Sequence, residues 1–192
     1  MPVLEAVTIP PDYTLLHNPT PSQLQEVYRL RILAWERQAR IRPEFASGWG
    51  PDDFDRIGQH WVILFQTHVI AAIRMTLHAS LTDIPDAECF TGVVPECLEP
   101  PIASYNRLVV HPEHRRLGLG KALDVCCINA AGISGASVLL GATGHVDGTK
   151  SRIPAMVALG FKILGSSPVP YRGIFEDEGF QTVLAYFFKP TP

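Results

Sequence analysis

The residues best suited to bind a charged ligand lie between positions 108 and 123. This segment, LVVHPEHRRLGLGKAL, places Gly118 and Gly120 between an apolar run and a helix-like run. Glycines let main-chain N–H groups converge on an anion, and the start of the following helix adds the positive end of its dipole. Basic side chains stand in the same loop: Arg115, Arg116 and Lys121. The segment therefore predicts a site for the diphosphate of a cofactor.

The two common nucleotide-binding loops do not match this segment. A Walker loop needs Ser or Thr after its Gly-Lys pair, whereas Ala122 follows Lys121 here. The pattern GxGxxG requires a third glycine where Leu123 stands. Both interpretations are excluded.

The spacing Arg115-x-x-Gly118-x-Gly120 closely resembles the R/QxxGxG/A signature of the GNAT superfamily of N-acyltransferases. The Leu-Gly-Phe segment at 159–161 and the expected order of elements over residues 21–188 are also similar to that family. The resemblance implies that the loop holds the pyrophosphate of acetyl-CoA or another acyl-CoA. The alternative is an ordinary helix start with solvated basic side chains. The implied cofactor-binding residues are Leu108, Val109, Val110, Arg115, Arg116, Leu117, Gly118, Leu119, Gly120 and Lys121.

The resemblance also implies a mechanism without a covalent enzyme intermediate. In this family two parallel strands splay apart, and the main chain of the first, here residues 108–110, pairs with the pantetheine arm. One of its N–H groups polarises the thioester carbonyl and stabilises the oxyanion that forms when an amine attacks. Ser104 and Asn106 on the same strand are not bases but can orient a water molecule. Tyr105 should point to the opposite face of the sheet.

The proton donor for the departing thiolate departs from the family pattern. Many members have a tyrosine four residues before the Gly-Phe pair, where this chain has Met156, and an asparagine seven residues earlier, where it has Thr149. Tyr171 is the candidate acid in their place, and the alternative is a tyrosine that packs within its loop.

A second group consists of two carboxylates and two arginines: Asp52, Asp55, Arg74 and Arg107. It resembles the acidic and arginine positions of acyl-homoserine-lactone synthases and N-acyl amino acid synthases, which share the GNAT fold. In those enzymes these residues organise the amine-side pocket, and the donors are acyl carrier proteins or acyl-CoA. Ser104 replaces their glutamate, while the complete phosphate loop favours a CoA donor. The alternative is a structural ion-pair network, since arginines within strands are seldom unpaired.

Strands and helices must position these residues. Apolar runs at 60–66 and 69–78 predict a β-hairpin, and residues 102–110 predict a strand. A helix is expected over 119–131, so the buried run 136–141 should be a parallel strand. The remaining expected elements are a first helix with Ser22 as N-cap, a helix over 150–159, and strands over 161–164 and 181–188.

The connecting segments are expected to be irregular. Residues 1–20 predict an extended arm, residues 41–58 a loop, and residues 79–101 a long excursion that suggests a functional rim. Arg31 lies among apolar neighbours on the first helix and is expected to snorkel to solvent rather than to meet a buried carboxylate. The histidines of interest are expected at strand ends or beside the loop in solvent: His60, His78, His111 and His114.

The composition limits the class of protein. A chain of 192 residues, 46% of them hydrophobic and 18% charged, is expected to fold around one core. Its net charge of −3 argues against a nucleic-acid partner. The apolar runs are shorter than the roughly 20 residues of a membrane span and no signal pattern is visible, so a cytoplasmic protein without a membrane partner is expected. The four cysteines contain no CxxC pair and the seven histidines no ligand set, so reduced thiols and no metal are expected.

These features predict a single-domain α/β protein of the GNAT fold. Its mixed central sheet should have splayed parallel strands and flanking helices, with an arm at 1–20 and the acyltransferase domain at 21–192. The expected function is transfer of an acyl group from acetyl-CoA or another acyl-CoA to the primary amine of a small molecule or peptide. The alternatives are an acyl carrier protein-dependent N-acyl amino acid or lactone synthase, and a non-catalytic CoA-binding module.

Overall fold

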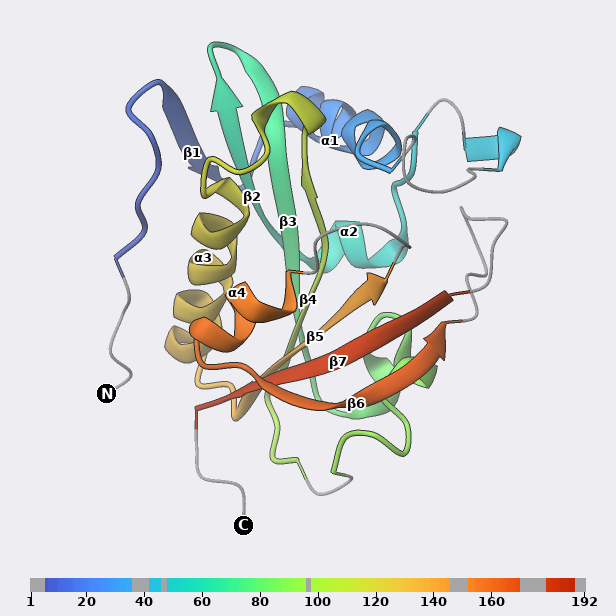
Figure 1. The fold of residues 1–192 in the computed structure, drawn as a ribbon. Coiled ribbons are helices and arrows are strands. Elements are labelled where there is room, and N and C mark those ends of the chain that lie inside the picture. Colours follow the sequence, from blue (N-terminus) through green and yellow to red (C-terminus); the bar gives the residue numbers. More distant parts are fainter. Residues whose placement is uncertain are drawn as a thin grey trace.

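The computed structural model describes residues 6–35, 42–45, 48–95, 98–145, 152–169 and 179–188. They form a seven-stranded sheet in the order β1-β2-β3-β4-β5-β7-β6 (Figure 1). Strands β4 and β5 are parallel and every other neighbouring pair is antiparallel, so the mixed sheet expected from the sequence is confirmed. The elements are β1 (Tyr13–His17), α1 (Pro21–Leu33), α2 (Asp53–Ile57), β2 (Gln59–Phe65), β3 (His68–His78), β4 (Ile102–Val110), α3 (Leu119–Ile133), β5 (Val138–His145), α4 (Ile153–Ala158), β6 (Lys162–Val169) and β7 (Gly179–Phe187).

Different helices cover the two faces of the sheet. Side chains alternate along a strand, so neighbouring residues of β2 face opposite sides. Ile63 packs in one apolar cluster with Leu123 of α3 and Met156 of α4, whereas Val62 packs in another with Val27 of α1. Figure 1 shows α3 and α4 together on one face and α1 and α2 on the other. The residues predicted to bind cofactor and those predicted to bind the amine therefore approach the sheet from opposite sides.

The predicted hairpin and the strand over 102–110 are confirmed, while several boundaries differ. Helix α1 begins after Thr20 rather than after the predicted N-cap Ser22. The Thr20 hydroxyl accepts a hydrogen bond from the Gln23 N–H at 3.3 Å, and the Gln23 side chain accepts one from the Thr20 N–H at 2.8 Å. Pro21 occupies the first helical position, where its fixed φ suits the helix and its missing N–H has no intrahelical partner to lose. Pro21 at the first helical position makes the preceding residue, Thr20, the N-cap.

Two segments predicted to be irregular contain regular structure. Within the arm, β1 pairs with β2 and forms one edge of the sheet. Within the predicted loop at 41–58, helix α2 has a capping box in which the side chains of Asp52 and Asp55 each accept a hydrogen bond from the other residue's main-chain N–H, at 2.9 and 3.0 Å. Each element has five residues, which is too short to show a period among prolines, glycines and acidic residues.

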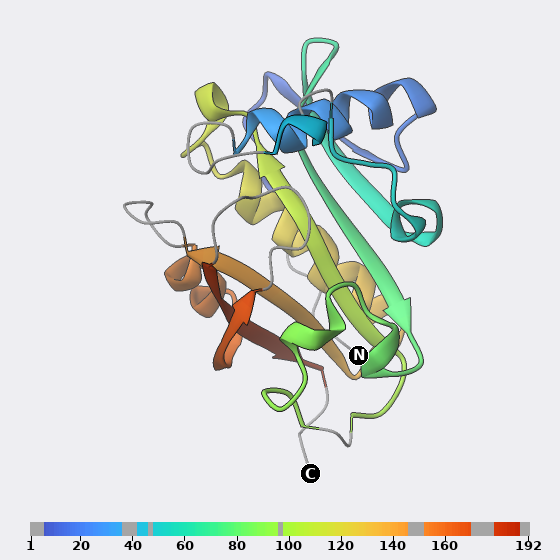
Figure 2. The same cartoon turned by 90° about the vertical axis from the view of Figure 1, so that its right-hand side faces the viewer.

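Strands β4 and β5 splay apart, as the sequence resemblance implied. They pair only from Ile102–Val138 to Ser104–Leu140. Beyond this point β4 contains a bulge, where its register with β3 shifts and Arg107 adopts a left-handed φ of +58°. Figure 2 shows the two strands close together at one end and diverging toward the other. Beyond Ser104 the main chain of β4 therefore has no pairing with β5.

Candidate active site

At the N-terminus of α3, main-chain N–H groups have no hydrogen-bond partner within the helix. Gly118 is the N-cap, and its φ of +79° lies in the left-handed region that favours glycine. The first hydrogen bond of the helix joins the Ala122 N–H to the Gly118 carbonyl at 3.0 Å, so the preceding N–H groups have no partner within the helix. Glycine has no side chain to cap them. The predicted diphosphate loop therefore has the geometry that such a group requires.

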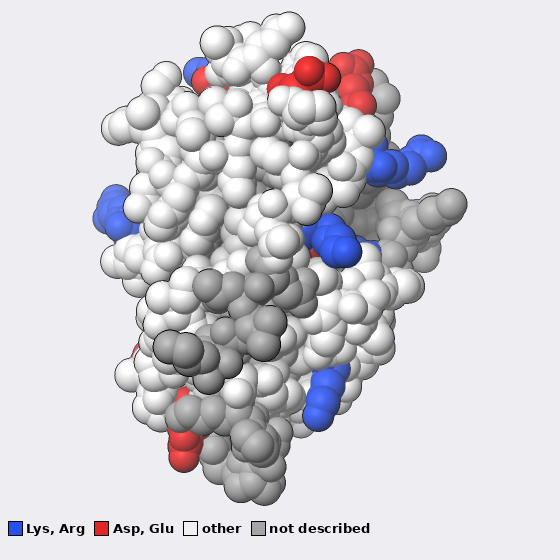
Figure 3. Space-filling view, turned by 90° about the vertical axis from the view of Figure 1, so that its left-hand side faces the viewer, with Lys and Arg blue, Asp and Glu red and all other residues white. Residues whose placement is uncertain are grey.

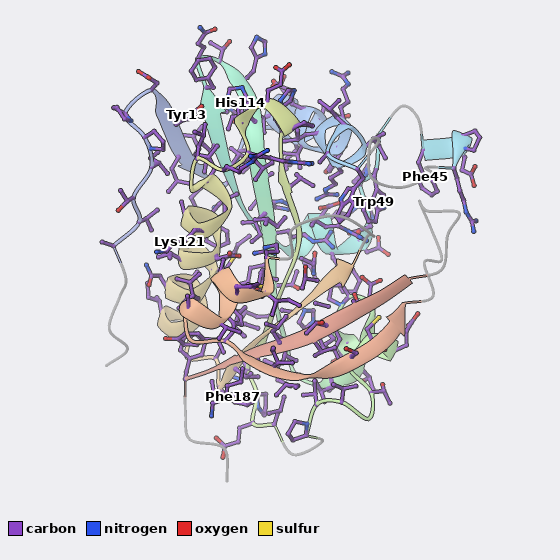
Figure 4. The ribbon with its side chains drawn as sticks, in the orientation of Figure 1. Tyr13, Phe45, Trp49, His114, Lys121 and Phe187 are labelled. Atoms are coloured by element: carbon purple, nitrogen blue, oxygen red, sulfur yellow. The ribbon has the colours of Figure 1, made fainter. Side chains whose placement is uncertain are left out.

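The three basic residues of this loop have different surroundings. Arg115 Nε donates to the Val110 carbonyl at 3.3 Å, and Arg115 Nη2 donates to the Ala34 carbonyl, at the end of α1, at 2.5 Å. The guanidinium therefore ties the loop to β4 and α1, and Arg115 can offer an anion its main-chain N–H. Arg116 and Lys121 are exposed, and Lys121 lies on α3 in Figure 4. Among the three, these two supply positive charge to solvent.

Strand β1 supports the loop from its other side. The Tyr13 hydroxyl lies 2.9 Å from His114 Nδ1, and Figure 4 shows the two side chains side by side. His114 was predicted to lie in solvent but is half-buried, because it also packs against Phe65 with ring centroids 5.1 Å apart. His111, also half-buried, accepts a hydrogen bond from the Glu113 N–H at 3.3 Å.

The edge of β4 that faces β5 is open beyond Ser104. Leu108 and Val110 point toward α3, since a Cβ built on Gly120 would lie 3.7 Å from Leu108 Cδ2 and 4.0 Å from Val110 Cγ2. Val109 is buried in the cluster under α1. Glycine at position 120 thus lets the start of α3 approach the open strand closely.

A cluster of five charged residues lies on the opposite face of the sheet, between α1, α2 and β3. Arg31 donates two hydrogen bonds to the Asp55 carboxylate, at 2.9 and 2.6 Å, and Arg74 Nη1 lies 2.8 Å from the same carboxylate. Arg74 also pairs with Asp52, and Arg107 lies 3.6 Å from the other oxygen of Asp52. The four residues singled out from the sequence are therefore brought together. The prediction that Arg31 snorkels to solvent is wrong, because Asp55 on the adjacent α2 provides a buried partner.

The cluster has a sealed part and a part open to solvent. The side chains of Arg31, Asp55 and Arg74 are at most 1% exposed, whereas those of Asp52 and Arg107 are 33% and 17% exposed. Burial alone would raise the pKa of Asp55, but hydrogen bonds and charge from Arg31 and the charge of Arg74 hold it well below its usual range. A ligand could reach only the outer pair, Asp52 and Arg107.

Trp49 forms one wall of the outer part. The Arg107 guanidinium carbon lies 3.6 Å from the centre of the Trp49 ring, a cation–π contact. Burial lowers the pKa of Arg107 to about 10, so it stays charged at neutral pH. Trp49 is not predicted from the sequence, because it stands in a segment without periodicity. Figure 4 places it close to α2.

Ser104 and Asn106 join this cluster to β4. Arg74 Nε donates to Asn106 Oδ1 at 2.8 Å, and Asn106 Nδ2 donates to the Ser104 hydroxyl at 3.5 Å. Tyr105 packs on the other face, in the cluster that includes α3, which confirms the predicted alternation. Side chains that could orient water thus lie next to the splay and on the face of the charged cluster.

His60 and His78 lie at strand ends, as predicted, but both are buried rather than at the surface. His60 Nε2 lies 3.0 Å from the Asp55 carbonyl oxygen, and His78 Nε2 lies 2.6 Å from the Thr76 hydroxyl. Burial lowers the pKa of both imidazoles. They are covered because α2 and the excursion after β3 fold over the ends of β2 and β3.

Met156 stands where many family members have a tyrosine. Met156 is buried, and its sulfur accepts a hydrogen bond from the Tyr105 hydroxyl at 3.6 Å. Tyr171 and Thr149 lie outside the described residues. Over the described ranges, no cluster of His, Cys, Asp and Glu could hold a metal ion, no helix is long and apolar enough to cross a membrane, and three cysteines are free and buried.

Residues 24–142 match the acetyltransferase (GNAT) family. The chain belongs to this family. Comparison with curated proteins finds no matching sequence. The expected single-domain GNAT fold is confirmed by the sheet, the splay and the structural neighbours of this GNAT protein.

Three solved structures illustrate the likeness. FeeM, an N-acyl amino acid synthase from uncultured soil microbes, is 12% identical with a TM-score of 0.67, covering 91% of this chain and 89% of FeeM. A GNAT family acetyltransferase from Elizabethkingia anophelis with acetyl-CoA bound is 13% identical with a TM-score of 0.56, covering 93% and 100%. Nourseothricin acetyltransferase is 16% identical with a TM-score of 0.60, covering 93% and 99%. At these identities the likeness is one of fold.

Proposed function

We propose that this GNAT protein transfers an acyl group from acyl-CoA to a primary amine. The observation that carries the proposal is the open main-chain edge of β4. It leads from the unpaired N–H groups at the start of α3 to Ser104 and Asn106 beside the charged cluster. A candidate anion site, an extended main-chain edge and a group of polar side chains follow one another along one strand.

The residues present fit coenzyme A. The N–H groups after Gly118, with Arg116 and Lys121, would hold the diphosphate, and the main chain of 108–110 would pair with the pantetheine amides. When bound, the acyl-CoA supplies an activated thioester carbonyl. Gly118 in its left-handed conformation and Gly120 against Leu108 leave the space that close contact between main chain and phosphate needs.

The protein's own groups then have three tasks at the carbonyl. An N–H at the β4 bulge stabilises the negative charge that develops on the carbonyl oxygen. Asn106, whose orientation is fixed by Arg74, and the Ser104 hydroxyl orient a water molecule that accepts a proton from the amine. The buried walls of the splay limit access of bulk water to the thioester.

A second candidate, an N-acyl amino acid synthase, is favoured by the charge of the cluster. It has one more guanidinium than carboxylate, and both Arg74 Nη2 and Arg107 Nε are buried without a hydrogen-bond partner among the described residues. A carboxylate on the acceptor amine would lie well beside Arg107. FeeM, whose fold is similar, is an N-acyl amino acid synthase. The donor in that case is an acyl-CoA or an acyl carrier protein.

Thiol release tests the proposal. The purified protein is incubated with acetyl-, octanoyl- and palmitoyl-CoA, alone and with free amino acids, polyamines or peptides with a free N-terminus. We expect thiol release that depends on the amine, with a matching N-acyl product by mass spectrometry. CoA binding without release over the whole panel would indicate a non-catalytic module. Release only from acyl carrier protein thioesters would favour the synthase that uses this donor.

A further inference from the structure

Tyr105 stands at the closed end of the splay. It follows Ser104, the last β4 residue paired with β5, and its ring lies against Gly141 of β5. A Cβ built on Gly141 would lie 2.6 Å from Tyr105 Cε1 and 2.8 Å from Cζ, so the ring fills the space that a side chain would take. Glycine at 141 therefore allows a phenol to lie across the point where the two strands part.

The hydroxyl of this phenol reaches the position where the family resemblance expects a proton donor. Tyr105 Oη donates to Met156 Sδ at 3.6 Å, and Met156 replaces the tyrosine that many GNAT members have on this helix. Methionine is unbranched and can change rotamer at low cost, so a bound ligand could displace its sulfur from the hydroxyl. One phenol hydroxyl, supplied by β4 instead of α4, thus lies in this region.

An ion pair between the partly exposed Arg152 and the buried Asp124 adjoins the same hydroxyl. Arg152 lies within hydrogen-bonding reach of Tyr105, and its Nη2 lies 2.5 Å from Asp124 Oδ1. Asp124 comes from α3 and is buried among apolar residues, so its charge is screened by solvent less than that of a surface carboxylate. The guanidinium places a positive charge beside the oxygen that would carry negative charge after proton loss. Cys127, the other titratable group close by, is buried and burial raises its pKa, so it stays neutral.

We propose that Tyr105 gives the departing thiolate its proton, in place of the tyrosine absent at position 156. This inference rests on the proposed acyl transfer. As the amine nitrogen bonds to the carbonyl carbon, the carbon–sulfur bond breaks and its electron pair passes to sulfur, which takes the proton of Tyr105 Oη. The phenolate, held beside Arg152, is protonated again from solvent, and the nitrogen loses one proton to the water molecule that Asn106 and Ser104 orient. Burial keeps the pKa of Tyr105 well above 10, so the hydroxyl holds its proton at neutral pH.

The test replaces one oxygen atom. Tyr105→Phe keeps the ring against Gly141 and removes the hydroxyl, and the expected result is a fall in kcat of about a hundredfold, the lower end of what general acid catalysis contributes. The acceptor KM, the CoA affinity and the melting temperature should stay close to wild type. Met156→Tyr in the Tyr105→Phe background returns a phenol from α4 and should restore part of kcat. Tyr171→Phe tests the rival acid, and the inference requires that its kcat fall far less than that of Tyr105→Phe.

The outcomes separate this inference from the proposed function. A wild-type protein that releases no thiol with any amine overturns the proposed function and this inference with it. An active wild type whose Tyr105→Phe variant is equally active overturns this inference alone. Loss of CoA affinity in parallel with kcat would also overturn it, because the hydroxyl would then act through binding or folding. A hundredfold loss in Tyr171→Phe with full activity in Tyr105→Phe would assign the acid to Tyr171.

Discussion

Single residues in the charged cluster have different tasks because their burial differs. Asp55 and Arg74 have side chains 1% and 0% exposed, and each has lost its hydration shell. Such a pair gives little net stability compared with apolar residues, yet removing one partner leaves a bare buried charge. Arg107, 17% exposed and stacked on Trp49, can lose its side chain without leaving a sealed charge behind.

Arg74→Ala should therefore act on the fold. We expect a loss of about 3–5 kcal/mol in the free energy of unfolding, since Asp55 loses one of its two guanidinium partners and Asn106 loses its donor. Urea denaturation followed by circular dichroism measures this loss. Wild-type stability in the variant would show that the cluster does not hold α2 against β3.

Arg107→Ala should act on the acceptor. We expect the acceptor KM to rise by about tenfold or more with CoA affinity nearly unchanged, because a charged hydrogen bond to a substrate carboxylate is worth about 1.5–3 kcal/mol. The matched control is Arg56→Ala, whose side chain is 74% exposed and pairs only with Asp53 in the described structure. Normal kinetics in the Arg107 variant would show that Arg107 and Asp52 form a structural ion pair and do not bind the acceptor.

The loop between β4 and α3 combines a support with a binding surface. Arg115 holds it to two carbonyl groups, while Arg116 extends into solvent from a left-handed φ of +64°. Both arginines are predicted from the sequence to bind the cofactor. Their side chains nevertheless point to different partners, which gives them separable effects.

Arg115→Ala and Arg116→Ala should thus have opposite profiles. Losing the two Arg115 hydrogen bonds should lower the free energy of unfolding by about 1–3 kcal/mol. Losing Arg116 should leave stability unchanged, weaken CoA several-fold and flatten the dependence of affinity on salt, since an exposed charge is screened by ions. Melting curves and calorimetry at two salt concentrations compare them. Equal CoA affinity in wild type and Arg116→Ala would show that the Arg116 side chain does not contribute to CoA binding.

Helices and strands with a long apolar run or a clear period were predicted from the sequence, whereas the shortest elements were not. The hairpin, the strand over 102–110 and the helix after Gly118 each carry a long apolar run or period, and all three are confirmed. Helix α2 was missed because its formation depends on two aspartates that cap each other. Arg31 was misjudged because its partner belongs to this missed helix, so a local error became an error in the site. The bulge at Arg107 also has no sequence signal, since tertiary contacts hold its backbone in the left-handed region.

The stability of the whole molecule should depend on pH through buried groups. His60 and His78 have pKa values lowered by burial, so below their ordinary value near 6.5 the unfolded chain binds more protons than the folded one. Their contribution is complete above this pH and declines as pH falls below it. Asp55, whose pKa is depressed, adds a further loss below about pH 4. Asp124, whose pKa burial raises, opposes part of that loss.

Urea denaturation at pH 8, 6.5 and 5 measures this dependence. We expect the free energy of unfolding to fall toward pH 5, and His60→Gln, which cannot gain a proton, to show a shallower slope. The exposed residue His68 provides the control, since His68→Gln should keep the wild-type slope. A flat profile in wild type would show that the two buried histidines do not become charged on unfolding.

The distribution of charge over the molecule bears on how an anionic ligand would be attracted. The face in Figure 3 shows Lys and Arg side chains standing apart, with no broad basic surface. With a net charge of −3, the chain has no general attraction for polyphosphates. Attraction for CoA must then come from the N–H groups and the few charges around Gly118 and Gly120.

Titration calorimetry with CoA on Gly120 variants examines this site directly. Gly120→Ala adds a methyl group at ordinary contact distance from Leu108 and should bind CoA as wild type does. Gly120→Val adds two further carbons between α3 and β4, which should block the approach of phosphate and weaken CoA binding at least about tenfold, while a melting temperature close to that of Gly120→Ala shows that the fold is kept. Unchanged CoA affinity in a folded Gly120→Val protein, or no CoA binding by wild type, would contradict the assignment of the splayed strands and the α3 N-terminus as an acyl-CoA site.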